Sequence, residues 1–234
     1  MAESHPWDVS PAEARAIQSD LAGRVDLRDA ISLDDIEIVA GIDSAYVKTD
    51  RQTMACAAVV AMTFPALEVI ETAVAWEPVV FPYVPGLLSF REGPAVLAAW
   101  GKLRTAPDVV LLDGQGHAHP RRFGLASHIG VLIGRPTIGC AKSRLIGEFA
   151  EPERVFGAHT PLVHRAEVVG AAVRTRPRHK PLFVSPGHKV SIETAVAIAL
   201  ACCRDGAFMP EPTRLAHETV TRERRQAIAA LGQT

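Results

Sequence analysis

The chain has 234 residues, of which 48% are hydrophobic and 22% are charged, and its formal net charge at pH 7 is −1. This length is enough to bury one substantial core, so we expect a single domain over residues 1–234, with its core over about residues 10–220. The near-neutral composition shows no bias toward nucleic acids, membranes or acidic ligands, so any contact with a polyanion must come from local basic patches.

The first predicted element is a helix that begins after Ser10. Ser10 stands at the N-cap, Pro11 at the first helical position, and Glu13 where a capping box requires it. Apolar residues then recur at spacings of three and four, which predicts one packed face; they are Ala14, Ile17, Leu21 and Val25.

A run of strands and helices follows. Strands are predicted at 36–47, 54–64, 67–78, 108–114, 136–142, 166–175 and 181–187, and helices at 95–103, 122–134 and 191–203. Short connectors join the first three strands into antiparallel hairpins. We therefore expect an α/β fold with a mixed central sheet flanked by helices, antiparallel in its first three strands and parallel in its second half. The ribonuclease H-like fold has this order. Residues 221–234 are interpreted as a short amphipathic helix or a frayed tail.

Two aspartates stand in or at the end of apolar strands. Asp43 interrupts "IEIVAGIDSAYV", and Asp113 closes "VVLLDG". A carboxylate is costly to bury there, and a hydrated cation is a common compensation. Singly, each has a structural explanation, because Asp113 could begin a turn and Asp43 could bond nearby backbone amides. Together they indicate a ligand site, since ligands of open α/β sheets collect at the carboxyl ends of strands.

Glu92 is the third acidic candidate. Ser89 and Glu92 have the spacing of a capping box. That reading puts Pro94 inside the helix, where its ring crowds the preceding turn, so a helix that begins at Pro94 is expected instead. Glu92 would then project from just before the helix and be free to bind a metal.

The segment "DGQGHAHPRRFG" at 113–124 is dense in functional residue types. Its Gly-x-Gly lacks the further residues of a dinucleotide or P-loop motif, which argues against that class. His117 and His119 have no Cys or Glu at a typical zinc-ligand spacing. Basic residues are either solvated or phosphate contacts; they are Arg121, Arg122, Lys142, Arg144, Arg174, Arg176, Arg178 and Lys180.

The cysteine pattern and the hydropathy bear on location. The four cysteines form no Cys-x-x-Cys pair, and no basic-then-apolar leader opens the chain. No run of about eighteen apolar residues without a charge occurs. We expect a cytoplasmic protein that makes no contact with membranes.

Six segments together resemble the successive blocks of the endonuclease V family. They are "GIDSAY", "FPYVPGLLSFRE", "LLDGQGHAHPRRFGLASHIGV", "GCAKSRLIG", "SPGHKVSIETA" and "PEPTRLAH", and they run in this order from about residue 37 to residue 217. The resemblance implies a ribonuclease H-like fold and a Mg²⁺-dependent endonuclease of DNA repair, with Mn²⁺ as a substitute. It further implies that the enzyme recognises deoxyinosine and cuts the second phosphodiester bond on the 3′ side, leaving 3′-hydroxyl and 5′-phosphate ends.

The resemblance also implies the catalytic residues. Asp43, Glu92 and Asp113 match the family's metal-binding carboxylates. Lys142 is placed near the phosphate, where an ammonium stabilises developing negative charge. His119 acts likewise, orients the water, or only orders its loop. His217 stands where many members have Asp, and an imidazole suits Mn²⁺ better than Mg²⁺. Binding a second metal, positioning a water and contacting phosphate therefore stay open, as does a surface histidine near a helix end with no such role.

Base recognition is implied for a different set. Tyr83, between Pro82 and Pro85, matches a wedge that fills the gap left by a flipped base, and the prolines keep it rigid. The resemblance implies a tight hypoxanthine pocket lined by backbone groups; these belong to Gly86, Leu88, Gly116 and Gly124.

Two rival functions remain at this point. One is a ribonuclease H-like nuclease for other structured DNA or for inosine-containing RNA, and the other is a nucleic-acid-binding protein without catalysis. The sequence leaves open which polymer matters and how many metals bind. A monomer is expected.

Overall fold

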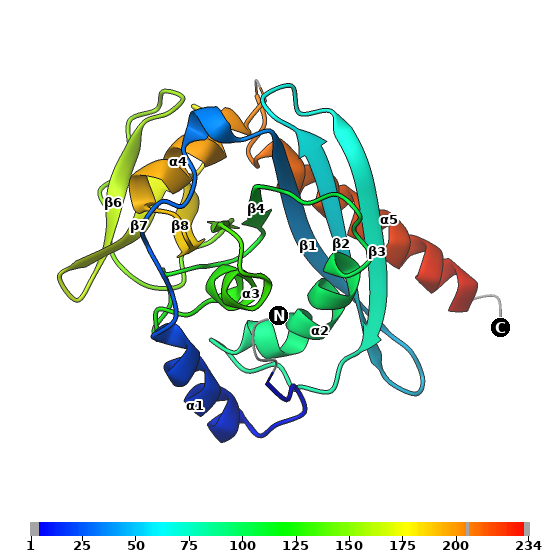
Figure 1. Ribbon diagram of the computed structural model, residues 1–234. Helices are drawn as coiled ribbons and strands as arrows, with labels where there is room; N and C mark the ends of the chain where they lie inside the picture. Colours follow the sequence, from blue (N-terminus) through cyan, green and yellow to red (C-terminus); the bar gives the residue numbers. More distant parts are fainter. Residues whose placement is uncertain (1–4, 205, 232–234) are drawn as a thin grey trace.

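A computed structural model describes residues 5–204 and 206–231 and contains one eight-stranded mixed sheet with helices on both faces (Figure 1). The strands are β1 (Ile38–Lys48), β2 (Thr53–Thr63), β3 (Val69–Pro78), β4 (Val109–Leu112), β5 (Thr137–Ala141), β6 (His159–His164), β7 (Glu167–Val173) and β8 (Leu182–His188). The helices are α1 (Pro11–Ala22), α2 (Leu88–Trp100), α3 (Leu125–Ile133), α4 (Ile192–Ala201) and α5 (Glu211–Leu231), with a 3₁₀ turn η1 (Leu33–Asp35).

The strand pairing confirms a mixed sheet and corrects one part of the expectation. The order is β3-β2-β1-β4-β5-β8-β7-β6. The first three strands are antiparallel, as expected, and β1, β4 and β5 are parallel. The second half is not parallel throughout, because β8, β7 and β6 pair antiparallel. A two-residue turn at Arg165 and Ala166, both with positive φ, reverses the chain between β6 and β7, and so forces them antiparallel.

Strand β6 has no counterpart among the predicted elements. It contains Pro161 and forms the outer edge of the sheet, where proline is tolerated because no neighbour needs its missing N–H. Its alternating exposure gave the sequence little apolar pattern from which to predict it.

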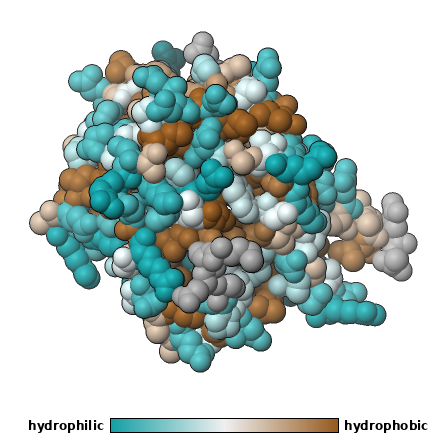
Figure 2. All heavy atoms as spheres, in the orientation of Figure 1, coloured by the Kyte–Doolittle hydropathy of each residue, from teal (hydrophilic) through white to brown (hydrophobic). Residues whose placement is uncertain are grey.

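The core lies on both faces of the central strands. Successive residues point to opposite sides, so Val39 belongs to one buried cluster and Ala40 to the other. The first cluster includes Ile198 of α4 and Ala216 of α5, and the second includes Val96 of α2. On the side of the molecule seen in Figure 1, hydrophilic and hydrophobic residues are interspersed over the surface (Figure 2).

The two terminal helices had different outcomes. The capping box of Ser10 and Glu13 is present at the start of α1, with Pro11 in the first turn. At the other end, α5 is 21 residues long and replaces the expected short helix or frayed tail; residues 232–234 lie outside the described part. None of the described helices is both long enough and apolar enough to span a membrane.

Helix α5 lies very close to β1 at one point. A Cβ atom added to Gly41 would lie 2.0 Å from the carbonyl carbon of Pro212 and 2.5 Å from the backbone nitrogen of Thr213. Backbone cannot move aside as a flexible side chain does, so only glycine fits here. This contact sets how the first turn of α5 sits on the sheet.

We expect Gly41→Ala to lower the free energy of unfolding by about 1–3 kcal/mol, because the new methyl overpacks the α5–β1 contact. Urea unfolding followed by circular dichroism measures this. Gly23→Ala is the matched control, since Gly23 has a φ of −67° and its nearest neighbour to an added Cβ is 3.6 Å away. Equal stability of the two variants would contradict the expectation.

Candidate active site

Two carboxylates meet at one end of the central strands. Asp43 lies in β1, and Asp113 directly follows β4. The two strands are parallel with Ile42 opposite Leu112, and the N–H of Asp113 donates to the carbonyl of Ile42 at 3.0 Å. His217, from α5, joins them, and one ligand atom from each of the three lies within 4.8 Å of the others. These three side chains, called the Asp-Asp-His cluster below, have the donor types of a divalent-cation site.

The cluster is held by short polar contacts. His217 Nδ1 lies 2.7 Å from Asp43 Oδ2, and the N–H of Ser44 donates to Asp43 Oδ1 at 2.8 Å. Lys142 Nζ donates to Asp113 Oδ2 at 2.5 Å. Burial raises the pKa of Asp43, and the charge of Asp113 raises it further, while the His217 hydrogen bond opposes the shift. The carboxylates therefore repel one another in a partly dry site, and a cation would relieve that repulsion.

Helix α2 begins earlier than the sequence predicts. It starts at Leu88, so Pro94 lies inside it and the expected start at Pro94 is wrong. No side chain in the described part of the chain caps the helix, so the alternative capping box of Ser89 and Glu92 does not form there. Leu87 and Phe90 are fully buried in an apolar cluster at this point. Burying these side chains outweighs the loss of one hydrogen bond at Pro94.

Glu92 is therefore a helical residue, and it is buried beside the Asp-Asp-His cluster. Its side chain accepts a hydrogen bond from the hydroxyl of Tyr46 at 2.9 Å. Burial raises the pKa of Glu92 to about 7, with a further increase from the charges of Asp43 and Asp113. Among the described residues, the ligand atoms that lie within 4.8 Å of one another belong to Asp43, Asp113 and His217, and Glu92 is not one of this group. Direct ligation by Glu92 stays a prediction.

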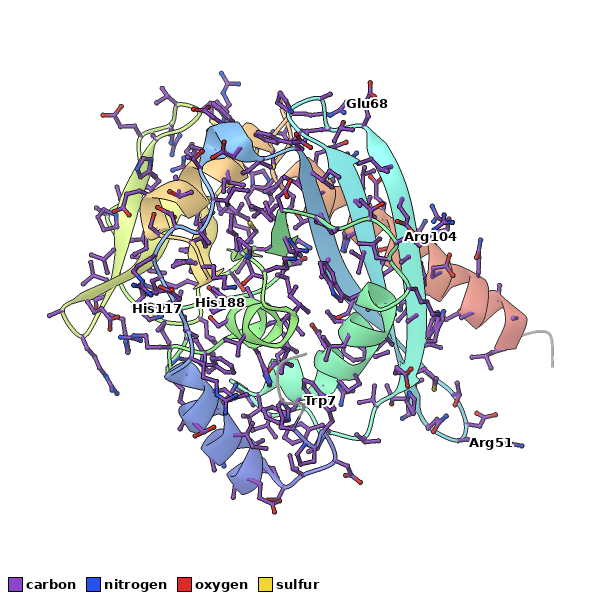
Figure 3. All side chains as sticks on the ribbon, in the orientation of Figure 1. Trp7, Arg51, Glu68, Arg104, His117 and His188 are labelled. Carbon is purple, nitrogen blue, oxygen red and sulfur yellow. The ribbon has the colours of Figure 1, made fainter. Side chains whose placement is uncertain are left out.

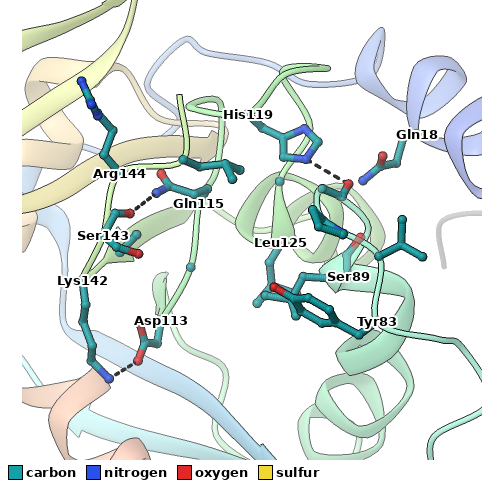
Figure 4. Close-up of a pocket in the computed structure, with 18 residues that line it drawn as sticks. Gln18, Tyr83, Ser89, Asp113, Gln115, His119, Leu125, Lys142, Ser143 and Arg144 are labelled. Atoms are coloured by element: carbon teal, nitrogen blue, oxygen red, sulfur yellow. Dashed lines mark hydrogen bonds and ion pairs between the residues drawn. The ribbon is translucent and has the colours of Figure 1, made fainter. Parts of the chain in front are cut away.

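A cavity of about 390 Å³ adjoins the cluster and reaches from Asp113 and Lys142 to the segment around Tyr83 (Figure 4). Five residues expected to bind the base line it, namely Tyr83, Pro85, Gly86, Leu88 and Gly124. The Tyr83 side chain is 72% exposed, which is unusual for an aromatic ring and suits a contact with a ligand. Pro82 is not among the lining residues.

Gly116 is not among the residues that line the cavity; it packs against β8 instead. Its N–H donates to Ser185 Oγ at 2.9 Å, and an added Cβ would lie 2.2 Å from the carbonyl oxygen of Pro186. The segment 113–124 thus needs this glycine in order to pack on β8. Gly124 is equally close-packed, since an added Cβ would lie 2.3 Å from the carbonyl oxygen of Gln115.

His119 lies across the pocket from the Asp113–Lys142 pair (Figure 4). Its Nε2 is 3.0 Å from the carbonyl oxygen of Gly86, and its Nδ1 accepts from the N–H of Arg121 at 3.2 Å. Burial lowers its pKa to about 4, so the ring is neutral and Nε2 carries the proton. Arg121 Nη2 donates to the same Gly86 oxygen at 2.6 Å. These contacts fix the pocket wall; the catalytic role of His119 stays a prediction.

Several basic residues of the sequence analysis are structural. Arg174 is 2% exposed and donates to Glu151 and to backbone carbonyls. Arg122 Nε donates to Glu167 Oε2 at 2.8 Å. The other carboxylate oxygen of Glu167 lies 2.8 Å from His117 Nε2. Buried or paired guanidinium groups are poor phosphate contacts. Lys142 and Arg144, by contrast, line the cavity.

The cavity also contains residues that the sequence analysis did not single out. They include Gln18, Val84, Gln115, Leu125, Ala141, Ser143 and Leu145; Ser89, which the sequence offered only as a helix cap, lines the cavity too. Gln115 Nε2 donates to the carbonyl of Ser143 at 2.9 Å. Gln115 lies within the segment 113–124, so the density of functional residues there was its only signal. Gln18 comes from α1, and nothing in its local sequence indicates a pocket.

Comparison with known proteins identifies the family of this chain. Residues 19–218 match the model of the endonuclease V family. Endonuclease V of Roseiflexus sp. (strain RS-1) is 52% identical over 211 residues, which cover 90% of this chain and 92% of that protein. The crystal structure of endonuclease V from Streptomyces avermitilis has a TM-score of 0.87 and 43% identity, covering 95% of this chain and 96% of the other.

A third protein has been solved with nucleic acid. Endonuclease V of Ciona intestinalis, in complex with a 24mer DNA containing an inosine followed by a ribo-adenosine, has a TM-score of 0.77 and 28% identity. The match covers 92% of this chain and 98% of that one. Family model, sequence relatives and structures all extend over most of the chain. The chain therefore belongs to the endonuclease V family.

Proposed function

We propose that this endonuclease V depends on a divalent metal and acts in DNA repair on deoxyinosine. It hydrolyses the second phosphodiester bond on the 3′ side of the lesion and leaves 3′-hydroxyl and 5′-phosphate ends. The observation that carries the proposal is the cavity of about 390 Å³ that opens beside Asp113 and Lys142. The inosine-containing DNA bound by the Ciona intestinalis relative supports the choice of base.

The donor set fits a divalent cation. Asp43 and Asp113 supply oxygen, which Mg²⁺ prefers, and His217 supplies a nitrogen, which Mn²⁺ accepts more readily. These three residues would hold the ion, with Glu92 alongside. Mg²⁺ remains our expected ion, with Mn²⁺ as a substitute. When bound, such an ion lowers the pKa of a water and offsets the charge of the scissile phosphate.

The remaining chemistry falls to side chains of the chain itself. The Lys142 side chain is 38% exposed although it is paired with Asp113, so its ammonium can also reach a phosphate oxygen. An ammonium at that position stabilises the negative charge that develops as the bond breaks. Lys142 also lines the cavity, so in this proposal it would lie close both to the extracted base and to the scissile phosphate.

Recognition requires that the base leave its stack. Tyr83 is the exposed ring at the cavity mouth, and stacking on the unpaired neighbours would offset part of the cost of extraction. Leu88 and Leu125 provide apolar walls for the purine ring. We keep the rigid finger formed by Pro82, Tyr83 and Pro85 as part of the proposal.

An alternative substrate is inosine-containing RNA or another structured DNA. The DNA of the Ciona intestinalis complex includes a ribo-adenosine next to its inosine, so at least that relative accepts a ribonucleotide there. We further propose a monomer in the cytoplasm. All four cysteines are free, which is compatible with a reducing compartment.

We expect the purified chain with Mg²⁺ to nick inosine-containing DNA but not undamaged DNA, and Asp43→Asn to lower that rate at least about 100-fold, because the amide lacks the negative charge of the carboxylate that would hold the metal. Gel assays on labelled DNA and RNA measure both. Glu68→Gln is the control, since Glu68 is exposed and lies at the far end of the sheet (Figure 3). Equal cleavage of damaged and undamaged strands, or full activity of Asp43→Asn, would contradict the proposal.

We expect Tyr83→Ala to lower cleavage of inosine duplexes about 10- to 100-fold, because stacking on one base contributes about 1–3 kcal/mol. Metal affinity, measured by calorimetry, should not change, and neither should thermal stability, since the ring is 72% exposed. Tyr83→Phe keeps the ring and should stay within about twofold of wild type. Loss of activity in Tyr83→Phe comparable to Tyr83→Ala would show that the hydroxyl, not the ring, matters.

We expect His217→Asp to raise activity with Mg²⁺ relative to activity with Mn²⁺, because it replaces the nitrogen donor of the cluster with oxygen. The ratio of initial nicking rates in the two ions measures this. His217→Ala removes the donor and should lower the rate in both ions. An unchanged Mg²⁺/Mn²⁺ ratio in His217→Asp would exclude His217 as a ligand.

A further inference from the structure

A chain of hydrogen bonds runs from the N-terminal segment to the wall of the cavity. His5 Nδ1 lies 2.8 Å from the carbonyl oxygen of Pro6, and His5 Nε2 lies 2.6 Å from His128 Nε2. On the other side of its ring, His128 Nδ1 lies 2.8 Å from Ser89 Oγ. The first and last members, Pro6 and Ser89, come from the N-terminal segment and from α2, with His128 of α3 between them.

The carbonyl of Pro6 fixes the direction of every bond in this chain. A carbonyl only accepts, so His5 Nδ1 must carry a proton. A neutral His5 then has a bare Nε2, which accepts the proton of His128 Nε2. A neutral His128 in turn has a bare Nδ1, which accepts the hydroxyl proton of Ser89. The hydroxyl proton is thus directed away from the cavity.

Both imidazoles are placed where the neutral form is favoured. His128 is 0% exposed, and burial lowers its pKa well below the usual value. Burial also lowers the pKa of His5. The ring of His128 packs against Trp7 at 5.2 Å and Phe123 at 4.9 Å between centroids. Trp7 lies beside α2 (Figure 3), where an added Cβ on Gly93 would lie 2.4 Å from its ring.

Ser89 is 1% exposed and lines the cavity, and no second hydrogen bond to its Oγ occurs within the described residues (Figure 4). Its oxygen therefore keeps free lone pairs but has no proton to offer. We propose that Ser89 is a specificity-determining residue that accepts a hydrogen bond from N1–H of hypoxanthine, and that His128 and His5 are positioning residues that hold it in the acceptor state. This inference rests on the proposed function, because it names how the same cavity selects its base.

The chemistry of the purines makes this acceptor selective. Hypoxanthine has a proton on N1, whereas adenine has a lone pair there. With the base held in one orientation, the lone pairs of Ser89 Oγ would attract the first and repel the second. A site with a fixed buried acceptor discriminates strongly, because the wrong partner leaves two acceptors facing each other without a proton.

The test compares cleavage of single-stranded oligonucleotides that carry inosine or 1-methylinosine, so that base pairing does not differ. We expect Ser89→Ala to lower kcat/KM on inosine about tenfold, as for a lost neutral hydrogen bond. Cleavage at 1-methylinosine, which has no N1 proton, should not fall, because the smaller side chain also makes room for the methyl group. The ratio of the two kcat/KM values therefore decreases about tenfold. His128→Phe should decrease that ratio too, since Ser89 is then free to turn its proton toward the base.

Ser127→Ala is the matched control, because Ser127 is a neighbouring buried serine whose Oγ has no hydrogen-bond partner among residues 5–204 and 206–231. It should leave the ratio unchanged. Thermal melting of each variant separates folding from recognition. The proposal is overturned if Ser89→Ala cleaves inosine within about twofold of wild type, or if both substrates lose activity by the same factor. Failure of the wild-type chain to nick inosine would instead refute the proposed function.

Discussion

The parallel pairing of β1 with β4 is the constraint on which the site depends. The parallel register places Ile42 opposite Leu112, so the residues that follow them, Asp43 and Asp113, lie side by side. In a partly dry site two carboxylates repel each other; burial raises the pKa of Asp43, and the charge of Asp113 raises it further. Lys142 offsets one of the charges, and His217 Nδ1 lies 2.7 Å from the other carboxylate. The fold thus holds two carboxylates close together, and a divalent cation bound between them would offset their repulsion.

Glycines at backbone contacts hold the parts around this edge in place. Gly41 lets α5 lie against β1, and so places His217. Gly116 and Gly124 let the segment 113–124 pack on β8 and on itself, which fixes the floor of the cavity. Their role is close packing, so the density of glycine in this motif has a structural cause even where a neighbouring residue lines the cavity.

The sequence indicated two carboxylates that meet in the fold, but fewer of the elements that hold them. Asp43 and Asp113 could be found because an isolated carboxylate in or after an apolar run is a local signal, and α1 could be found from its capping box. The start of α2 could not, since burial of Phe90 outweighed the local rule for Pro94. Strand β6 has little apolar pattern, and its pairing depends on β7. The hydrogen bond between His5 and His128 joins residues 123 positions apart, a relation that only the folded chain reveals.

The two sides of the cavity differ in how much freedom they retain. The carbonyl of Gly86 is bound by both His119 and Arg121, and Arg121 is bound in turn by Gln18 of α1 at 2.6 Å, so this wall is already fixed without a ligand. Tyr83, three residues earlier, is mostly exposed. Ordering a side chain on binding costs about 0.5–1.5 kcal/mol, and this cost falls on the exposed residues of the lining, Tyr83 and Leu145 among them. Under the proposed function, a wall that cannot reshape itself around a wrong base would make the cavity selective, while exposed lining side chains such as Tyr83 would adjust to the strand.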